Sequence, residues 1–298
     1  MTNKISIILI NYNTSDLTLK CVKSIQKSTY KNWQLIIIDN YSNQENKNKL
    51  AKIQDRKIKI IFNKQNLGFA KANNQGIKLA LKKQTDYILV LNNDTEINQE
   101  TLEIFVKSFE QNKFNKSNTI LSSIIIFGEN KQIWFNGLFD LPLLNFPKTQ
   151  DKNKQFNKLN HDKKYLKSQY STGCCMFFTK EFIKANGLMS EKYFLYFEDF
   201  SFSKGKNNII IQEPLIKHHV SASSGFLGQE KISKLQAYYY GKNQIWYYFK
   251  DKKISFPEKI IFLLFTIWIR PILYIRDLPT LRSYFIGLFA GLFSKNFK

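Results

Sequence analysis

A chain of 298 residues with 43% hydrophobic and 23% charged residues has the composition of a globular protein, which excludes wholesale disorder. The 45 Lys and Arg against 23 Asp and Glu give a formal charge of +22, which favours anionic partners such as nucleotides or phospholipid headgroups. The basic residues are mostly lysine and are dispersed, without the gathering of basic and aromatic residues that marks a nucleic-acid-binding face, so we expect no nucleic-acid partner.

Four apolar segments in the first hundred residues have the pattern of strands that are buried on both faces of a parallel sheet. These strands are predicted over residues 5–10, 35–38, 58–62 and 87–91. Helical patterns separate them, over residues 14–28, around residues 50–53 and over residues 70–81. The alternation of strand and helix predicts a doubly wound α/β sheet.

Polar residues follow each of these strands, at positions 11–13, 39–40, 63–68 and 92–94. In doubly wound sheets, ligands bind outside the carboxyl ends of the strands, so the sequence predicts a binding site along this edge. The loop after the first strand lacks the Gly-rich, Arg-containing pattern of a sugar nucleotidyltransferase, which argues against that class of enzyme.

The middle of the chain is less regular. Residues 148–167 are rich in Lys, Asn and Gln and have little periodicity, which predicts a loop. Around this loop we expect strands over residues 122–127, 172–178 and 209–211, and a helix over residues 181–185 that ends at Asn186-Gly187.

Asp94 stands beside Asn93 at the end of a buried strand, where its carboxylate could be a ligand of Mg²⁺ or Mn²⁺. A metal ion there could bridge the two phosphates of a nucleotide sugar and neutralise the departing diphosphate. The same residues also suit a turn with a helix cap, which needs no ligand. Asp39 could likewise bind a ribose hydroxyl or a base N–H, or could cap a loop.

Asn66-Leu67-Gly68-Phe69 precedes a predicted helix that contains Asn74, so backbone N–H groups suited to phosphate stand at a helix start. The segment is neither a Walker loop nor a Gly-x-Gly-x-x-Gly fingerprint. It is therefore a candidate phosphate contact of moderate specificity.

Glu198-Asp199 follows a run of aromatic and aliphatic residues, where a carboxyl group tends to have a raised pKa and can accept a proton from a sugar hydroxyl. The alternative is an exposed acidic pair at a helix start. His218 could complete a metal shell or contact a diphosphate, although most histidines do neither. His161, in the polar loop, has no expected function.

These motifs together resemble glycosyltransferase family 2, the inverting enzymes of GT-A fold, in its rhamnosyltransferase-like branch. The resemblance covers roughly residues 4–250, and its specificity comes from the order and spacing of many motifs. They are Ile5 to Asn13, Ile38-Asp39-Asn40-Tyr41-Ser42, Asn66-Leu67-Gly68-Phe69-Ala70, Leu91-Asn92-Asn93-Asp94-Thr95, Ser171-Thr172-Gly173, Phe194 to Asp199, residues 218–225 and Tyr240-Gly241-Lys242-Asn243.

The resemblance implies a Rossmann-like mixed sheet with helices on both faces and a C-terminal helical extension. It also implies a dTDP-, UDP- or GDP-linked sugar donor, a Mg²⁺ or Mn²⁺ ion and a glycan or lipid-linked acceptor in polysaccharide synthesis. Asp199 would be the catalytic base with Glu198 as its companion, and Asp94 and His218 would bind the metal. The donor-binding residues would be Tyr12 near the base, Asp39 at the nucleoside, and Asn13, Asn66, Gly68, Asn74 and Asn93.

Two departures from the family pattern concern the acceptor side. Ser201 stands where the family has a second Asp, and Lys204 lies near the expected Arg. The link from Asp199 to His218 is also short, with residues 206–208 in place of a longer helix. The competing interpretation is therefore a weakly active or non-catalytic membrane-associated scaffold of the same fold.

We expect a glycosyltransferase domain over residues 1–220 and a C-terminal helical region over residues 221–298. The apolar run 260–275 is interrupted by Arg270 and Pro271, and the run 284–293 is short, whereas a membrane-spanning helix needs roughly 20 apolar residues. Basic residues beside Trp, Phe and Leu favour a helix that lies in the membrane interface. The alternative is a helical subdomain that packs on the main domain or on the partner of a homodimer.

Cys21, Cys174 and Cys175 form neither a disulfide framework nor a zinc-binding spacing. The apolar run at residues 5–10 is too short for the core of a signal peptide. We therefore expect a cytoplasmic protein, at the inner face of the membrane.

Overall fold

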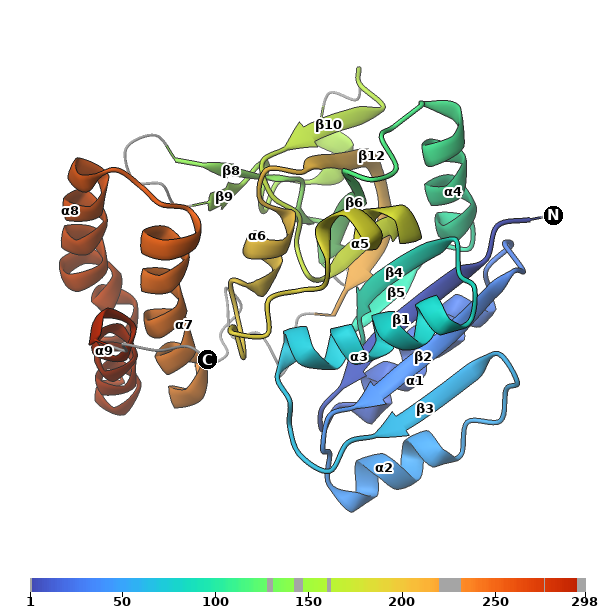
Figure 1. Cartoon of the computed structure of the whole chain (residues 1–298), viewed down its shortest axis with the longest axis horizontal. Coiled ribbons are helices and arrows are strands. Elements are labelled where there is room, and N and C mark those ends of the chain that lie inside the picture. The colour runs from blue at the N-terminus through green and yellow to red at the C-terminus, as the bar shows by residue number, and fades with distance from the viewer. Residues whose placement is uncertain are drawn as a thin grey trace.

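The computed structural model of the protein describes residues 2–127, 131–141, 147–159, 162–219, 232–275 and 277–293. Its centre is a large mixed sheet, with helices on both faces and a group of C-terminal helices at one end (Figure 1). The strands along the main path of the sheet stand in the order β10-β12-β6-β11-β4-β1-β2-β3. This confirms the predicted fold class.

The first half of the chain folds as the strand and helix patterns predict. β1, β2, β3 and β4 are parallel neighbours, and a helix follows each of the first three. The elements are β1 (Ile5–Asn11), α1 (Ser15–Gln26), β2 (Trp33–Asp39), α2 (Gln44–Ala51), β3 (Ile58–Phe62), α3 (Phe69–Lys82) and β4 (Tyr87–Asn92).

The second half adds strands of both directions to this sheet. β11 is antiparallel to β4, β12 is parallel to β6, and β10 and β5 pair antiparallel with β12. The elements are β5 (Thr95–Ile97), α4 (Thr101–Gln111), β6 (Thr119–Phe127), β7 (Ile133–Phe135), β8 (Leu138–Asp140), β9 (Pro147–Thr149), η1 (Phe156–Lys158), β10 (Tyr165–Ser168), β11 (Cys175–Thr179), α5 (Lys180–Asn186), α6 (Glu198–Ser203) and β12 (Asn207–His218).

The prediction of a structureless loop over residues 148–167 is wrong in the part that the structure describes. β9 pairs with β8, and β10 pairs with β12 from Tyr165 to Ser168. These strands are three and four residues long, so their partners in the sheet stabilise them more than their own sequence pattern does. α5, by contrast, ends as predicted, with Gly187 at a positive φ of 78°.

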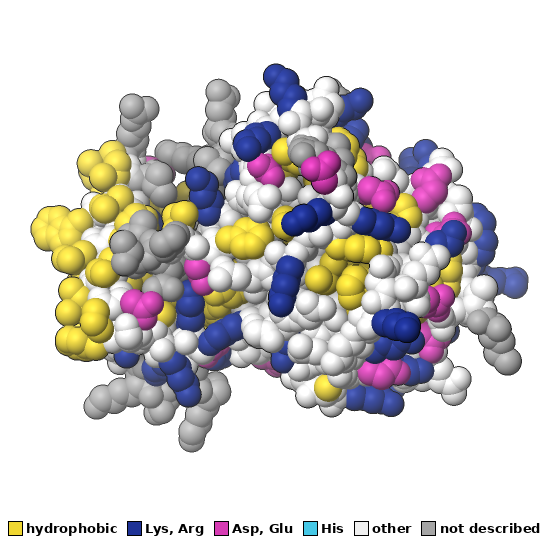
Figure 2. Space-filling view, turned by 90° about the horizontal axis from the view of Figure 1, so that it is seen from above, with side chains coloured by type: hydrophobic (Ala, Val, Ile, Leu, Met, Phe, Trp, Pro, Cys, Tyr) yellow, Lys and Arg dark blue, Asp and Glu magenta, His cyan; other side chains and the backbone are white. Residues whose placement is uncertain are grey.

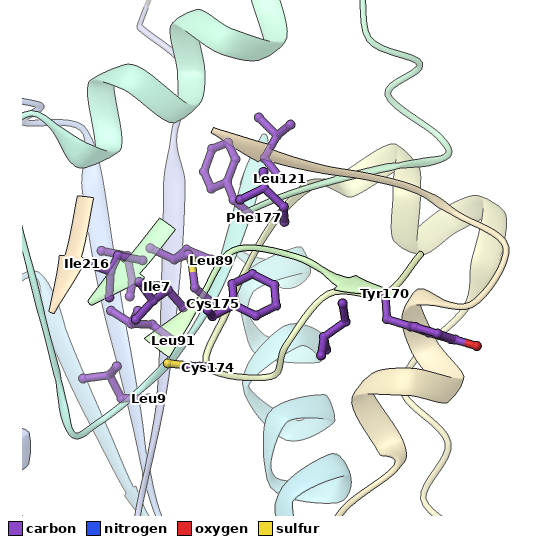
Figure 3. Close-up of a cluster of buried hydrophobic side chains, with 14 of the residues drawn as sticks. Ile7, Leu9, Leu89, Leu91, Leu121, Tyr170, Cys174, Cys175, Phe177 and Ile216 are labelled. Carbon is purple, nitrogen blue, oxygen red and sulfur yellow. The ribbon is translucent and has the colours of Figure 1, made fainter. Parts of the chain in front are cut away.

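Alternate residues of the central strands face opposite helical layers. Ile7 and Leu9 of β1 pack in one cluster with residues of α1 and α4, whereas Ile8 packs in a second cluster with residues of α3 and α5. Figure 3 shows part of the first cluster, in which Cys174 and Cys175 lie beside Leu91. Burial raises the pKa of the Cys21 and Cys175 thiols to about 12, so these thiols stay protonated at neutral pH.

The C-terminal helices pack on the main domain. Buried residues of α7 and η2 belong to the same hydrophobic cluster as the central strands, so this region has no separate core. The predicted domain boundary at residues 220–221 lies outside the described residues. The elements are α7 (Lys234–Trp246), η2 (Tyr247–Asp251), α8 (Phe256–Leu264), η3 (Phe265–Ile269), η4 (Arg270–Tyr274) and α9 (Leu278–Phe293).

In the part of the chain that the structure describes, none of the helices combines the length and the apolarity needed to cross a membrane.

Glycines allow α9 to approach α7 closely. A Cβ atom added at Gly287 would lie 2.0 Å from the backbone oxygen of Tyr238, and one at Gly241 would lie 2.4 Å from that of Tyr284. We expect Gly287→Ala to lower the free energy of unfolding by about 2 kcal/mol, because overpacking outweighs the gain in helix propensity. Chemical denaturation measures this, with Ser283→Ala on the same helix as the control. Unchanged or increased stability of Gly287→Ala would contradict the close packing.

Candidate active site

The ends of β1 and β2 carry a buried polar cluster that is centred on Asn11. Asn11 is the register partner of Asp39, and its Nδ2 donates to Asp39 Oδ2 at 2.7 Å and to Ser42 Oγ at 2.9 Å. The backbone N–H of Ser42 donates to the other oxygen of Asp39 at 3.0 Å. The predicted nucleoside residue Asp39 is thus fully buried and held in one orientation.

Tyr12 and Asn13 follow β1 beside this cluster. The Asn13 N–H donates to Ser42 Oγ at 2.9 Å, and Asn13 Oδ1 accepts from the backbone N–H of Asn43 at 2.8 Å. Asn13 has a positive φ of 55°, which its polar side chain tolerates better than most. Tyr12 is 49% exposed, so its ring is accessible to a ligand.

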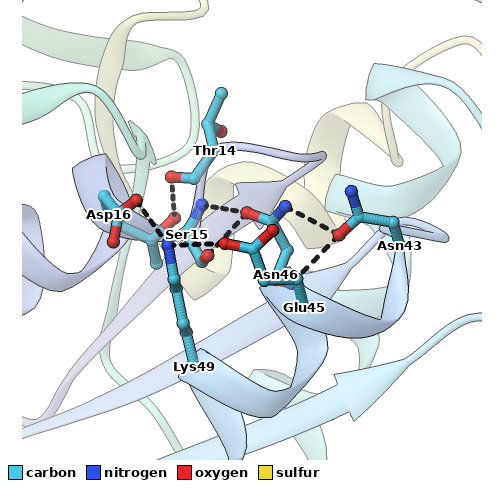
Figure 4. A network of polar contacts seen from close by, with 8 residues as sticks. Thr14, Ser15, Asp16, Asn43, Glu45, Asn46 and Lys49 are labelled. Atoms are coloured by element: carbon cyan, nitrogen blue, oxygen red, sulfur yellow. Dashed lines mark hydrogen bonds and ion pairs between the residues drawn. The ribbon is translucent and has the colours of Figure 1, made fainter.

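A second polar network joins the starts of α1 and α2 (Figure 4). Asn46 Oδ1 accepts from the Ser15 N–H at 2.9 Å and from its hydroxyl at 2.6 Å, while Asn43 caps α2. Lys49 forms an ion pair with Asp16 at 2.8 Å. These contacts hold the loop after β1 against the loop after β2, which positions Tyr12 and Asp39 relative to each other.

Asn93 is connected to the same cluster from the end of β4. Its Nδ2 donates to Thr14 Oγ1 at 2.7 Å and to Thr18 Oγ1 at 2.8 Å. Thr18 in turn donates to Asn11 Oδ1 at 2.8 Å, so Asn93 and Asp39 are joined through two side chains. Thr14 occupies the N-cap position of α1, but its hydroxyl contacts Asn93 and makes no cap hydrogen bond.

Asp94 and His218 are brought together by the pairing of β5 with β12. His218 is the register partner of Thr95, and its Nε2 lies 3.0 Å from Asp94 Oδ1. Both side chains are almost completely buried, and Trp134 packs against the imidazole in a T-shaped arrangement with ring centroids 4.4 Å apart. Within the described residues, His218 Nδ1 is buried without a hydrogen-bond partner.

The donor set of this pair, one carboxylate and one imidazole, suits Mn²⁺, and the carboxylate also suits Mg²⁺. Among the described residues, no group of three or more His, Cys, Asp or Glu side chains forms a complete metal site. Mg²⁺ ions at phosphate sites typically use one or two carboxylates together with substrate phosphates and water, so a two-residue protein contribution is compatible with such an ion.

The loop that contains Asn66 and Gly68 is held in place by hydrogen bonds within the protein. The N–H groups of Leu67, Gly68 and Phe69 donate to Asn40 Oδ1, Asn66 Oδ1 and the oxygen of Phe194. Gly68 has a φ of 77°, and a Cβ there would lie 2.5 Å from the same oxygen of Phe194. Because these three N–H groups are engaged, the contacts do not support their predicted role as phosphate donors.

Asn74 forms its hydrogen bonds with residues that are not among the other predicted site residues. Its amide group bonds both to the backbone of Met189, at 2.9 and 3.0 Å, and to Glu191 Oε1 at 3.0 Å. In this structure Asn74 joins α3 to the segment that leads to Glu198.

Asp199 lies near residues from both the first and the second half of the chain. Its Oδ2 accepts from the Gly173 N–H at 3.0 Å and its Oδ1 from the Phe200 N–H at 2.9 Å. A Cβ at Gly173 would lie 3.1 Å from the ring of Phe69 and 3.6 Å from Asp199 Cβ. Gly173 therefore lies between Asp199 and Phe69, the residue that follows Asn66-Leu67-Gly68.

The two adjacent carboxyl groups have raised pKa values. Desolvation raises the pKa of Asp199 above its ordinary value, although hydrogen bonds from the backbone of Gly173 and Phe200 oppose the shift. Desolvation, reinforced by the negative charge of Asp199, raises the pKa of Glu198 much further. Glu198 Oε2 is buried without a hydrogen-bond partner among the described residues, so no protein donor there would stabilise a negative charge on it. Of the pair, Asp199 is thus the one suited to be an ionised base.

The backbone before Glu198 is strained. Tyr196 and Phe197 have positive φ values of 68° and 71°, and such residues cost of the order of 1–3 kcal/mol each unless their surroundings hold them. Asn243 of α7 donates to the oxygens of Leu195 and Tyr196 at 2.8 and 3.3 Å, and Phe197 is buried. The C-terminal region therefore holds the turn that presents Glu198 and Asp199.

Comparison with known proteins agrees with this architecture. The solved structure of GalNAc-T7 with UDP, GalNAc and Mn²⁺ superimposes with a TM-score of 0.60 at 15% identity, over 91% of this chain and 57% of that one. An uncharacterised glycosyltransferase of Rickettsia conorii is 35% identical over 46% of this chain but only 22% of its own length. The dTDP-rhamnosyl transferase RfbF of Shigella flexneri is 25% identical over 67% of this chain and 62% of its own.

The family model described as "Glycosyl transferase family 2" matches residues 6–187. This range contains the polar strand ends of β1, β2 and β4, together with Gly173, whereas Glu198, Asp199 and His218 lie beyond it. The chain belongs to glycosyltransferase family 2.

Proposed function

We propose that this protein transfers a sugar from a dTDP-, UDP- or GDP-linked donor to a hydroxyl group of a glycan or lipid-linked acceptor in cell-surface polysaccharide synthesis, with inversion at the anomeric carbon. The observation that carries the proposal is the position of Asp199, a desolvated carboxylate held by Gly173 beside Phe69. The family supports the glycosyl transfer, the name of RfbF supports rhamnose as one candidate sugar, and the ligands of GalNAc-T7 support a nucleotide and a divalent cation.

In the proposed reaction, Asp199 accepts the proton of the acceptor hydroxyl. The acceptor oxygen forms a bond to the anomeric carbon as the bond from that carbon to the diphosphate oxygen breaks, and the diphosphate leaves with the electron pair. Attack from the face opposite the diphosphate inverts the configuration. The two backbone N–H groups fix the direction of the Asp199 carboxylate, so its orientation costs little when the acceptor arrives.

On the donor side, Asp39 and Tyr12 are proposed to contact the nucleoside, with Asn13 beside them. Asp94 and His218 are the residues that would hold a divalent cation, which would supply positive charge to the departing diphosphate. Asn66, Gly68, Asn74 and Asn93 are proposed to support the site, because each is bonded to neighbouring protein groups.

A panel of dTDP-, UDP- and GDP-sugars tests this proposal, with and without Mn²⁺. Thermal shift reports donor binding, and release of nucleoside diphosphate reports turnover. We expect one nucleotide class to stabilise the protein more than the others, and Asp39→Ala to remove most of that shift. Binding without turnover, across donors and glycan acceptors, would instead favour the non-catalytic scaffold. Absence of any nucleotide binding would contradict the proposed glycosyl transfer.

A further inference from the structure

The C-terminal helices present an apolar surface that the protein does not cover. Of the seventeen large hydrophobic side chains that are exposed in the described residues, thirteen lie between Phe256 and Phe293. Figure 2 shows hydrophobic side chains gathered at the end of the molecule that carries α8 in Figure 1. Exposed apolar surface of this extent is uncommon on a soluble monomer and marks an interaction site.

In the helical stretch from α8 to η4, the apolar side faces outward and polar groups face inward, which is the reverse of a surface helix on a water-soluble protein. One stripe at four-residue spacing faces outward and is apolar, and we call it the outer stripe: Phe256, Ile260, Leu264, Trp268 and Ile272, between 46% and 75% exposed. The opposite stripe, at the same spacing, is buried and contains polar groups: Phe262, Thr266, Arg270 and Tyr274. Arg270 points inward, with its guanidinium 3.9 Å from the ring centre of Tyr240. The inversion indicates an apolar medium outside.

The charge around the outer stripe favours one occupant. From residue 250 to the end, the chain has nine Lys and Arg against three Asp and Glu. The Glu258 carboxylate is engaged in the capping box of α8, and that of Asp277 hydrogen-bonds to Thr280 at the start of α9. A second copy of a chain of charge +22 would be repelled, whereas anionic lipid headgroups would be attracted.

We propose that the outer stripe docks this protein on an anionic lipid bilayer, with α8 to η4 lying along the surface and Trp268 in the headgroup boundary. Trp is enriched at that depth, because its ring is apolar and its N–H is polar. The arrangement would place the glycosyltransferase domain on the membrane surface, within reach of lipid-linked acceptors.

Vesicle binding tests this proposal directly. Trp33 and Trp246 are buried and Trp134 is half-buried, whereas Trp268 is 72% exposed, so a blue shift of tryptophan emission on binding reports mainly on Trp268. We expect the full chain to co-sediment with phosphatidylcholine–phosphatidylglycerol vesicles and to show this shift. The pair Trp268→Glu and Ile272→Glu should weaken binding by at least about tenfold. Trp268→Phe is the matched control, which should bind but lose most of the blue shift.

Three outcomes would overturn the proposal. They are absence of vesicle binding with a monomer in analytical ultracentrifugation, a dimer that the Glu variants dissociate and that binds no vesicles, or equal binding to pure phosphatidylcholine at all salt concentrations. None of them bears on donor turnover in solution, so failure here is distinct from failure of the proposed function.

A second inference rests on a different observation, the contacts of Asp251 at the end of η2. Asp251 Oδ2 accepts from Ser201 Oγ at 2.9 Å and from the Tyr193 hydroxyl at 2.8 Å, and Oδ1 contacts the Lys192 ammonium. Lys204 Nζ donates to the backbone oxygen of Asp251. One residue of the C-terminal region thus holds the chain on both sides of Glu198-Asp199.

Asp251 places a negative charge beside position 201, where the family resemblance leads us to expect Asp and the chain has Ser. Burial acts to raise the pKa of Asp251, but hydrogen bonds from Lys192, Tyr193 and Ser201 outweigh it and the pKa is lowered, so the carboxylate is ionised at neutral pH. The side chain is 17% exposed, which shields these contacts from water.

We infer that Asp251 supplies, from fifty residues away, the carboxylate that the chain lacks at position 201, and that it acts as a positioning residue for Asp199. The inference rests on the proposed function. In this interpretation the carboxylate expected at position 201 is present, but it belongs to Asp251. The Ser at position 201 is then no longer the main reason to regard the protein as degenerate.

Exchanging the two residues tests the relocation. We expect Asp251→Ser to lower kcat by about tenfold with little change in donor KM, and the double variant Ser201→Asp, Asp251→Ser to recover to within about threefold of the parent. The acid limb of the pH profile should shift in the single variant and return in the double variant. Lys250→Ala, at the exposed neighbouring residue, is the control and should leave kcat unchanged.

An equal loss in the single and double variants, with both folded by circular dichroism, would overturn the relocation. So would a single variant with the kcat and pH profile of the parent. If the parent itself turns over no donor, the proposed function fails instead.

Discussion

Asp199→Asn is expected to lower kcat by roughly 10³-fold, within the range for removal of a general base, while donor affinity stays nearly unchanged. Asn preserves the shape of the side chain and can still accept one backbone hydrogen bond, but it cannot take a proton from the acceptor hydroxyl. Single-turnover transfer measures the chemical step, and thermal shift with the donor measures binding. Normal turnover by Asp199→Asn would remove Asp199 from the role of base.

Glu198→Gln is the matched control for this change. Desolvation and the charge of Asp199 raise the pKa of Glu198 well above its ordinary value, so the protein favours the neutral form of this carboxyl group. Gln reproduces that neutral state, so we expect a loss of less than about tenfold. A loss in Glu198→Gln as large as in Asp199→Asn would show that the two carboxyl groups have been assigned the wrong way round.

The pH dependence follows from the same shifts. A base must be ionised, so activity falls as the pH drops through the pKa of Asp199. Because desolvation raises that pKa, the acid limb of kcat should lie above the ordinary Asp value of 3.8. Glu198→Gln removes the neighbouring carboxyl group without adding charge, so the limb should stay near its original position. An acid limb below 3.8 would contradict the desolvation of Asp199.

The parallel half of the sheet could be predicted because each strand and helix carries its own local pattern. Ile5 to Ile10 is apolar at every position but Ser6, which is the pattern of burial on both faces. β5 and β10 could not be predicted in this way, because they have three and four residues and pair with β12 residues at least 40 positions away. Helix α4 was not predicted, although Leu102, Phe105, Val106 and Phe109 follow a helical period.

The site residues divide in the same way, into those that a local motif reveals and those whose role depends on the fold. Asp39, Asp94 and Asp199 are recognisable because each has a motif around it. Asn11, the centre of the donor-side cluster, is visible in the sequence only as the first polar residue after a predicted strand, and its role depends on the register that places it opposite Asp39. Asp251 has no motif at all. Its part follows from the fold of the C-terminal region against Ser201.

Asp94→Asn is the second substitution with a large expected effect. Asp94 is the buried carboxylate 3.0 Å from His218, and Asn keeps its size while removing the negative charge that would hold a divalent cation. We expect a loss of roughly 10²–10³ in kcat/KM, the size found when one preorganised electrostatic contact is removed. The concentration of Mn²⁺ that gives half-maximal activity should also rise.

Substitution of the two consecutive histidines tests the proposed metal-binding role of His218. His218 contacts Asp94 in a site closed to solvent, whereas His219 contacts Glu96 with 26% of its side chain exposed. His218→Gln should therefore raise the Mn²⁺ requirement by about 10–100-fold, and His219→Gln should leave it nearly unchanged. Isothermal titration with Mn²⁺ in the presence of nucleoside diphosphate checks this without turnover. Equal effects of the two changes would mean that Asp94 and His218 form a structural pair, and the cation would then have to be held elsewhere.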